Sequence, residues 1–473
     1  MIKQTIKFNS PNKYFGGFIQ NIIDQSNIKA SIEQNENTIN ILVDDTDPNL
    51  ETFNKNLQNY LPHSIFLDEI ETIQSEENIS DTRFTSPQYN IAPCNKCLEL
   101  LNDPSSTHYL DENLLCEHYS NVAEQKYEDY TIFSPHYKKD ASVLITNSTK
   151  INELFILTEA EIKALFSIEK PTIKATIKDE SLKNLTNQNY IYVKAPYNNR
   201  SALAAINAKE SGVDYLFFED IDDLKIVIVQ KNTSIIKASR VATPLAKLND
   251  DPTLNRFLNI AKEAQFTKGA IGANLNTQGI NFIVNNELGT KQVITFQDFD
   301  LAKLLIEFQE DEKRSKLFAN FKSKYPQVAQ EMENSKELGL FETISIILEL
   351  NDNNSKEKSA FETVSNKGYE FRGNGGLKID TNYISGGFDY SSFIGSIISF
   401  KLAGADMHYL AYSIFEAIAD MSISTLNQLK EKFKCDNIIM MGDMFSNSVL
   451  YSRILSKYQL SNPYFSKAIA LAD

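Results

Sequence analysis

The stretch APCNKCLELLNDP, residues 92–104, stands between two parts of the chain with different patterns. Within it, Cys94 and Cys97 place two thiols on one tight turn, which is the geometry of half a tetrahedral zinc site. Cys116 follows after eighteen intervening residues, the spacing of a zinc-ribbon half-motif. The expected fourth cysteine, three residues later, is a tyrosine, so His118 is the nearest replacement ligand. The sequence therefore predicts one zinc ion held by three cysteines and this histidine.

Two alternatives remain open at this site. His108 and His136 are more distant candidates for the fourth ligand. A decayed finger that holds no metal is the simpler structural interpretation, because an incomplete ligand shell weakens metal affinity. Four cysteines in a chain of 473 residues do not form a disulfide framework, so a disulfide role for the cluster is excluded.

The part before the cysteines, residues 1–75, has the order strand, helix, strand, strand, helix, strand. This order predicts a ferredoxin-like split βαβ fold. The polar stretch from residue 74 to 89 predicts a linker, and the segment 76–140 as a whole is expected to combine linker and zinc-finger remnant. The expected strands are 2–8, 30–34, 38–43 and 64–70, and the expected helices are 17–28 and 50–60.

The part after the cysteines predicts two further domains. Residues 141–244 contain a capping box at Thr158 and Glu161 and three apolar strand patterns, which predicts an α/β domain. The last two of these strands, 215–218 and 225–229, are joined by an acidic stretch that we expect to be a solvated hairpin turn. Residues 245–473 carry hairpin-like strands and then long helical patterns. The chain is thus expected to be multidomain, with α+β and α/β parts.

The composition excludes some classes of partner. The chain has 47 basic and 62 acidic residues and a net charge of −15, which opposes binding to nucleic acid or anionic lipid. No run of about 18 apolar residues is present, and residues 1–8, MIKQTIKF, lack the features of a secretory signal. We expect a cytoplasmic protein without membrane insertion.

Several segments resemble the HypF family, the carbamoyltransferases that mature [NiFe]-hydrogenases. The cysteine stretch, including its Asp-Pro, is similar to the first zinc finger of that family. The resemblance implies an acylphosphatase-like domain, zinc fingers, a YrdC-like domain and a TsaD-like ASKHA domain, matching in order 1–75, 76–140, 141–244 and 245–473. The other similar segments, in the family's order, are Ala164–Pro171, Ala195–Tyr197, Gly272–Thr277 and Met441–Ser448.

Residues that the family uses for chemistry are changed. Gly16 stands where the resemblance places an arginine, Gln34 stands for a catalytic asparagine, and Lys13 is the one cation available as a substitute. The family's Ser-Gly-Asn loop is missing before Tyr215, and residues 301–337 hold no histidine where the family binds a metal.

The phosphate loop of the ASKHA domain is also altered. It keeps Gly442, and Asn447 resembles the asparagine of the same loop, so these two residues are weak candidates for nucleotide binding. Asp443 replaces the second glycine of this loop, and its carboxylate would repel a phosphate.

These changes predict a HypF-like accessory protein without catalytic residues, which binds hydrogenase subunits or hydrogenase maturation factors. One alternative is a divergent carbamoyltransferase or nucleotide-hydrolysing enzyme of hydrogenase maturation that uses replacement residues. A second alternative is a zinc-dependent structural module in which the resemblance records descent only.

Overall fold

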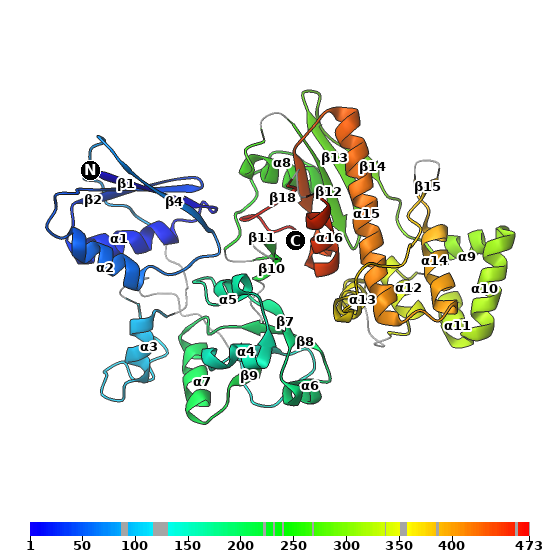
Figure 1. The fold of residues 1–473 in the computed structure, drawn as a ribbon, viewed down its shortest axis with the longest axis horizontal. Helices are drawn as coiled ribbons and strands as arrows, with labels where there is room; N and C mark the ends of the chain where they lie inside the picture. Colours follow the sequence, from blue (N-terminus) through cyan, green and yellow to red (C-terminus); the bar gives the residue numbers. More distant parts are fainter. Residues whose placement is uncertain are drawn as a thin grey trace. The chain divides into compact units, whose positions relative to one another are not determined.

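The structure, a computed structural model, forms two compact units, Met1–Pro244 and Leu245–Asp473 (Figure 1). Among the residues that it describes, no helix is long and apolar enough to cross a membrane. Its description covers residues 1–86, 93–116, 131–220, 224–229, 232–238, 241–266, 269–335, 337–350, 357–384, 387–458 and 462–472.

The N-terminal part of unit 1 is a four-stranded antiparallel sheet in the order β2-β3-β1-β4, with both helices on one face (Figure 1). The centre of this layer is aromatic: Phe8 stacks on Phe15 with ring centroids 5.1 Å apart and meets Phe66 edge-on at 5.8 Å. The elements are β1 (Ile2–Phe8), α1 (Tyr14–Ser26), β2 (Ala30–Asn35), β3 (Thr38–Val43), α2 (Leu50–Tyr60) and β4 (Leu67–Gln74).

The strand and helix patterns predicted here are confirmed, but three local expectations were wrong. Helix α1 begins at Tyr14 rather than Gly17, and β4 starts later than residue 64 because Ser64 and Ile65 bond instead to Glu169. Residues 75–86 are not a loose linker. Arg83 forms a two-bond ion pair with a carboxylate of α1, and further hydrogen bonds tie this segment to α1 and β2.

The rest of unit 1 contains the short cysteine-bearing helix α3 (Asn95–Asn102) and a five-stranded mixed sheet in the order β6-β7-β8-β5-β9. The predicted capping box at Thr158 and Glu161 is confirmed with both of its hydrogen bonds. The elements of this part are β5 (Ser142–Ile145), α4 (Ile151–Leu154), β6 (Phe155–Ile156), α5 (Glu159–Leu165), β7 (Ile173–Ile177), α6 (Glu180–Thr186), β8 (Tyr190–Lys194), α7 (Asn199–Glu210), β9 (Tyr215–Phe218), β10 (Lys225–Val229) and β11 (Asn232–Lys237).

The expected acidic hairpin between β9 and β10 is wrong. Strand β9 pairs with β5, whereas β10 pairs with β11 in a separate two-stranded sheet. Asp220, which we expected in a solvated turn, has a side chain only 6% exposed and lies 3.3 Å from the buried Nζ of Lys194. It also accepts a 2.5 Å hydrogen bond from Thr172 Oγ1. A buried cation requires such a counter-charge, so the Asp220 carboxylate lies in the interior beside Lys194.

Unit 2 is built on a five-stranded sheet in the order β14-β13-β12-β17-β18, in which β12 pairs antiparallel with β13 and parallel with β17. The predicted long helix is confirmed as α15 (Met407–Phe433). The other elements are α8 (Pro252–Glu263), β12 (Ala270–Asn276), β13 (Gly279–Asn286), β14 (Gly289–Thr295), α9 (Leu301–Glu310), α10 (Glu312–Lys324), α11 (Pro326–Asn334), α12 (Leu340–Ile347), α13 (Glu357–Glu370), β15 (Tyr383–Ile384), β16 (Gly387–Phe388), α14 (Tyr390–Leu402), β17 (Ile438–Met441), α16 (Ser448–Lys457) and β18 (Tyr464–Phe465).

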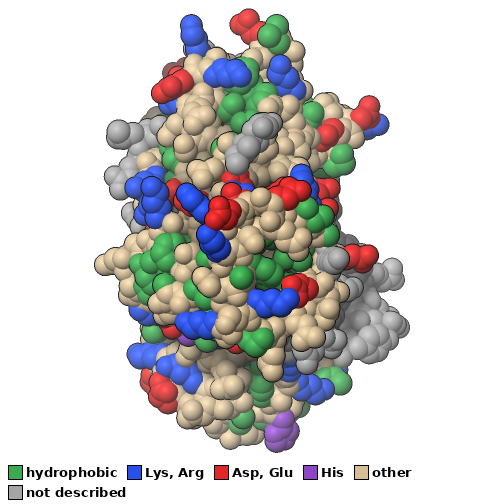
Figure 2. Space-filling model, turned by 90° about the vertical axis from the view of Figure 1, so that its right-hand side faces the viewer, with side chains coloured by type: hydrophobic (Ala, Val, Ile, Leu, Met, Phe, Trp, Pro, Cys, Tyr) green, Lys and Arg blue, Asp and Glu red, His purple; other side chains and the backbone are tan. Residues whose placement is uncertain are grey.

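The surface charges agree with the acidic composition. On the face drawn in Figure 2, basic and acidic side chains alternate over the coloured residues and form no continuous basic patch. The absence of a nucleic-acid partner stays a prediction, which rests on the net charge of −15.

Candidate functional site

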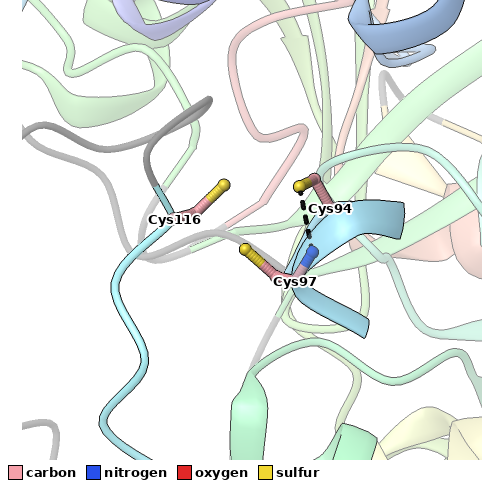
Figure 3. A group of neighbouring side chains, drawn as sticks. All are labelled: Cys94, Cys97 and Cys116. Atoms are coloured by element: carbon pink, nitrogen blue, oxygen red, sulfur yellow. Dashed lines mark hydrogen bonds between the residues drawn. The ribbon is translucent and has the colours of Figure 1, made fainter. Parts of the chain in front are cut away.

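Three thiols from the predicted zinc motif meet in unit 1. The Sγ atoms of Cys94, Cys97 and Cys116 all lie within 4.8 Å of one another, and all three side chains are buried (Figure 3). Cys94 caps the N-terminus of α3, where its sulfur accepts a hydrogen bond from the backbone N–H of Cys97. In a tetrahedral zinc site with metal–sulfur bonds of about 2.3 Å, neighbouring sulfurs are about 3.8 Å apart. The cluster therefore has a spacing that a single metal ion can occupy.

The electrostatics of the cluster favour a bound cation. Hydrogen bonds with Cys116 and Cys94, together with burial, raise the pKa of the Cys97 thiol above its usual range. Without a cation, this raised pKa favours the protonated form of the Cys97 thiol, because ionised sulfurs this close repel one another. A divalent metal ion offsets that repulsion and stabilises the thiolates that bind it. The donor set is soft, which suits zinc among the common divalent ions.

The fourth ligand is not found among the described residues. His118, the predicted ligand, lies outside the described residues. His108 and His136 are described, and neither belongs to the cluster. His108 is instead paired through Nδ1 with Asp111 at 3.3 Å.

Removing one thiol is expected to abolish tight metal binding. Loss of an outer-shell partner alone costs about 10–100-fold in metal affinity, and Cys97→Ser removes a ligand itself, so its affinity for Zn²⁺ should fall by more than about 100-fold. Elemental analysis of the purified protein and competition with a chromogenic chelator measure this. Cys435→Ser is the matched control, because Cys435 is also buried but lies in unit 2 outside the cluster. Equal metal content in Cys97→Ser and wild type would refute the assignment.

The loop before α1, where the resemblance places phosphate chemistry, is closed by the chain itself. A Cβ atom on Gly16 would lie 2.8 Å from ring atoms of Phe84, so no larger side chain fits there while Phe84 stays in place. Gln34 uses its Nε2 to donate to the backbone carbonyls of Ser10 (3.3 Å) and Asn12 (3.0 Å). Its amide nitrogen therefore braces the loop, while its Oε1 atom is buried without a hydrogen-bond partner among the described residues.

A cavity of about 440 Å³ beside this loop is lined by both candidate substitutes, Lys13 and Gln34, and by Phe84. The Lys13 ammonium lies 5.8 Å from the centroid of the Phe84 ring, a cation–π distance. Phe84 was not predicted as part of this site. In the sequence it is an isolated aromatic residue in a polar segment. The structure thus brings together the two residues that the sequence singled out and adds a third that covers them.

In unit 2, the loop that resembles a phosphate-binding loop is bonded to its neighbour. The Asp443 carboxylate accepts hydrogen bonds from Thr277 N and Thr277 Oγ1, both at 2.8 Å. In return, Asp443 N donates to Asn276 Oδ1 at 2.9 Å. The carboxylate therefore takes up backbone and hydroxyl donors of the kind that hold a phosphate oxygen.

The two weak nucleotide-binding candidates have structural contacts. Gly442 adopts φ +118°, a conformation that favours glycine. Asn447 is buried; its Oδ1 caps α16 at Leu450 N, and its Nδ2 donates to Ser365 Oγ at 2.7 Å. Nucleotide binding by this pair stays a prediction, and Asn447 would have to exchange existing hydrogen bonds to take part.

Solved structures have a similar fold over almost the whole chain. A crystal structure of full-length HypF in the phosphate- and nucleotide-bound form aligns with 99% of the chain and 96% of its own, with a TM-score of 0.62 and 11% identity. The crystal structure of T. kodakarensis HypF aligns with 100% of the chain and 96% of its own, with a TM-score of 0.62 and 12% identity. The chain has the HypF fold.

Sequence comparison adds a relative that matches part of the chain. Protein HydE of Wolinella succinogenes is 25% identical over 338 residues, which cover 64% of the chain. The chain spans 61% of the length of that relative. No family model matches the sequence. The similarity to HypF proposed from sequence motifs is thus supported by the fold.

Proposed function

We propose that the chain is a HypF-like accessory protein of [NiFe]-hydrogenase maturation that acts by binding other proteins and carries out no carbamoyl transfer. The HypF fold over the whole chain supports a role in maturation. The proposed partners are hydrogenase subunits or hydrogenase maturation factors, and the proposed setting is the cytoplasm. We further propose that the bound metal is one zinc ion, held by the three cysteines and His118, with a structural role.

The observation that carries this proposal is the bonding of Asp443. In the corresponding loop of a nucleotide-binding protein, backbone donors are free to meet a phosphate. Here a carboxylate of the chain already accepts from Thr277 N and Thr277 Oγ1. An incoming phosphate would have to displace this carboxylate and would also be repelled by its charge. The donors at the Asp443 loop are therefore already bonded to a carboxylate of the chain itself.

Purified protein is expected to show no ATP binding and no release of phosphate from ATP or carbamoyl phosphate. Calorimetry with ATP and a colorimetric phosphate assay measure this directly. Asp443→Gly removes the competing charge and is expected to lower stability by about 1–3 kcal/mol, because Thr277 loses its acceptor. The rival enzyme hypothesis makes the opposite prediction: wild type releases phosphate, and Lys13→Ala, which removes an ammonium beside the N-terminal loop, reduces that release.

The role itself is tested by a pull-down with the tagged full chain from cells that express the hydrogenase and its maturation factors. Recovery of hydrogenase subunits or maturation factors at near-stoichiometric yield is expected, and an unrelated tagged protein of similar charge is the control. Recovery of neither class would overturn the accessory role, while the nucleotide assays would still report on catalysis separately.

A further inference from the structure

A second cavity, of about 850 Å³, lies in unit 1 beside the cysteine helix. Helix α3 contributes Leu98 to its lining, and helix α7 contributes Ile206. Ile145 at the end of β5 and Phe166 after α5 add further apolar surface. Small-molecule sites usually have volumes of about 300–1,000 Å³ and mostly apolar walls with a few polar groups. This cavity, which we call the α3–α7 cavity, lies in that size range, and about half of its lining residues are apolar.

Among the charged side chains that line the α3–α7 cavity, that of Lys170 is the least exposed. Glu99, Asp103 and Lys209 also line it, but they are exposed and therefore largely screened by solvent. Lys170 is partly buried, and its Nζ donates one hydrogen bond, to the carbonyl oxygen of Phe166 at 3.0 Å. Among the described carboxylates, none lies within ion-pairing distance of this ammonium.

The backbone at Lys170 is strained. Its φ is +47°, in the left-handed region that non-glycine residues rarely adopt. Such strain persists only where the surroundings hold the residue in place, and observed cases cluster at ligand sites. The adjacent Glu169 is fixed by hydrogen bonds from Tyr14, Ser64 and Ile65, which hold this part of the chain firmly.

Burial also changes the acidity of the ammonium. It lowers the pKa of Lys170 to about 8, partly offset by the charge of Glu169. This direction is the one that burial of an ammonium produces. Among the described residues, the ammonium donates one hydrogen bond and lies 5.8 Å from the centroid of the Phe166 ring, a cation–π distance. A partly desolvated cation in this setting is an electrostatic site for an anion.

The wall opposite Lys170 is held by the cysteine cluster. Helix α3 begins at its cap residue Cys94, and Leu114 packs against the three cysteines. Asn199, the first residue of α7, donates through Nδ2 to the carbonyl oxygens of Leu114 (2.7 Å) and Glu112 (3.1 Å). Both sides of the cavity are therefore positioned before any ligand arrives, which lowers the entropic cost of binding.

We propose that the α3–α7 cavity binds a small organic anion, whose carboxylate or phosphate group pairs with Lys170 and whose apolar body lies against Phe166 and Leu98. The site belongs to unit 1 and is independent of the loops that the proposed function treats as closed. Its ligand is defined by one negative head group and an apolar body of a size that fits about 850 Å³.

Two anions and a neutral analogue test the proposal by calorimetry on the full chain. Benzoate and phenyl phosphate distinguish the two head groups, and benzyl alcohol has the same ring without a charge. At least one anion is expected to bind wild type about tenfold or more tightly than benzyl alcohol does, because a charge-assisted hydrogen bond contributes that much. Lys170→Met keeps the length of the side chain and should lose this difference. Lys163→Met is the control, since Lys163 is exposed on α5 and outside the cavity lining.

A second measurement remains valid if Lys170→Met fails to fold. Wild-type protein is treated with limiting acetic anhydride at pH 8, and acetylated lysines are mapped by mass spectrometry. The bound anion is expected to protect Lys170 while Lys163 is acetylated at the same rate with and without it. The proposal is overturned if neither anion binds, if benzyl alcohol binds as tightly as the anions, or if Lys170 is not protected.

Discussion

Gly442→Ala is expected to prevent unit 2 from folding stably. Gly442 has φ +118°, and a Cβ atom there would lie 2.5 Å from the carbonyl carbon and 2.7 Å from the backbone nitrogen of Leu275. Backbone atoms cannot rotate away as a flexible side chain could. Leu275 belongs to β12, which is paired on one side with β13 and on the other with β17. Both the strained φ and the clash therefore remain, and we expect a loss of more than about 4 kcal/mol, a large share of the roughly 5–15 kcal/mol by which native proteins are stable.

Thermal unfolding followed by circular dichroism, together with the yield of soluble protein, measures this effect. Gly279→Ala is the matched control, because Gly279 lies in the same sheet and a Cβ atom there would meet nothing within 4 Å. The control is expected to melt close to wild type. A melting temperature of Gly442→Ala within about 2 °C of wild type would contradict the argument.

Glu169→Ala is expected to destabilise unit 1 by about 3–5 kcal/mol. The Glu169 side chain is 3% exposed. Its carboxylate accepts hydrogen bonds from Tyr14 OH (2.6 Å), Ser64 Oγ (2.5 Å) and Ile65 N (3.0 Å). These donors come from the N-terminal sheet layer, whereas Glu169 follows α5 of the α/β part, so the carboxylate joins the two parts of unit 1. Its removal leaves three donors without an acceptor in a buried place.

Denaturant unfolding of the full chain, with probes in each unit, resolves this change. Tyr14→Phe deletes one of the three donors and should cost only about 1 kcal/mol, and Glu153→Ala, which removes an exposed carboxylate, should be close to neutral. The double variant Tyr14→Phe with Glu169→Ala should be less destabilised than the sum of the two, because both remove the same bond. A loss of less than about 1 kcal/mol in Glu169→Ala would show that water replaces the carboxylate and would refute this role.

Local patterns in the sequence were sufficient for much of the fold. The alternation of apolar residues predicted strands such as Thr38–Val43 with their observed bounds. The spacing of Thr158 and Glu161 predicted a capping box, and both of its hydrogen bonds are present. The three cysteines were predicted to meet from spacing alone, and they do. Each of these features depends on neighbours within one motif.

Contacts between distant segments could not be predicted. Glu169 bonds to Ser64, 105 residues away, and nothing in either local pattern marks the pair. The acidic stretch near Asp220 predicts a solvated turn, because runs of charged residues usually face water. Instead, Asp220 pairs with Lys194, which lies 26 residues earlier on another strand. The pairing of Asp443 with Thr277 spans 166 residues. Polar residues that are satisfied by long-range partners look the same in sequence as those that face water.

The two adjacent glycines in α1 have an evolutionary consequence. Phe84 occupies the space beside Gly16, and Ser86 occupies the space beside Gly17, so the connecting segment and the helix fit only as a pair. An arginine at position 16 would have to displace the Phe84 ring, because a Cβ atom there would already lie 2.8 Å from it. A change at this position alone would therefore disturb the contact between α1 and the segment that holds Phe84 and Ser86. Substitutions in these two segments are thus coupled, and each limits the residues that the other can accept.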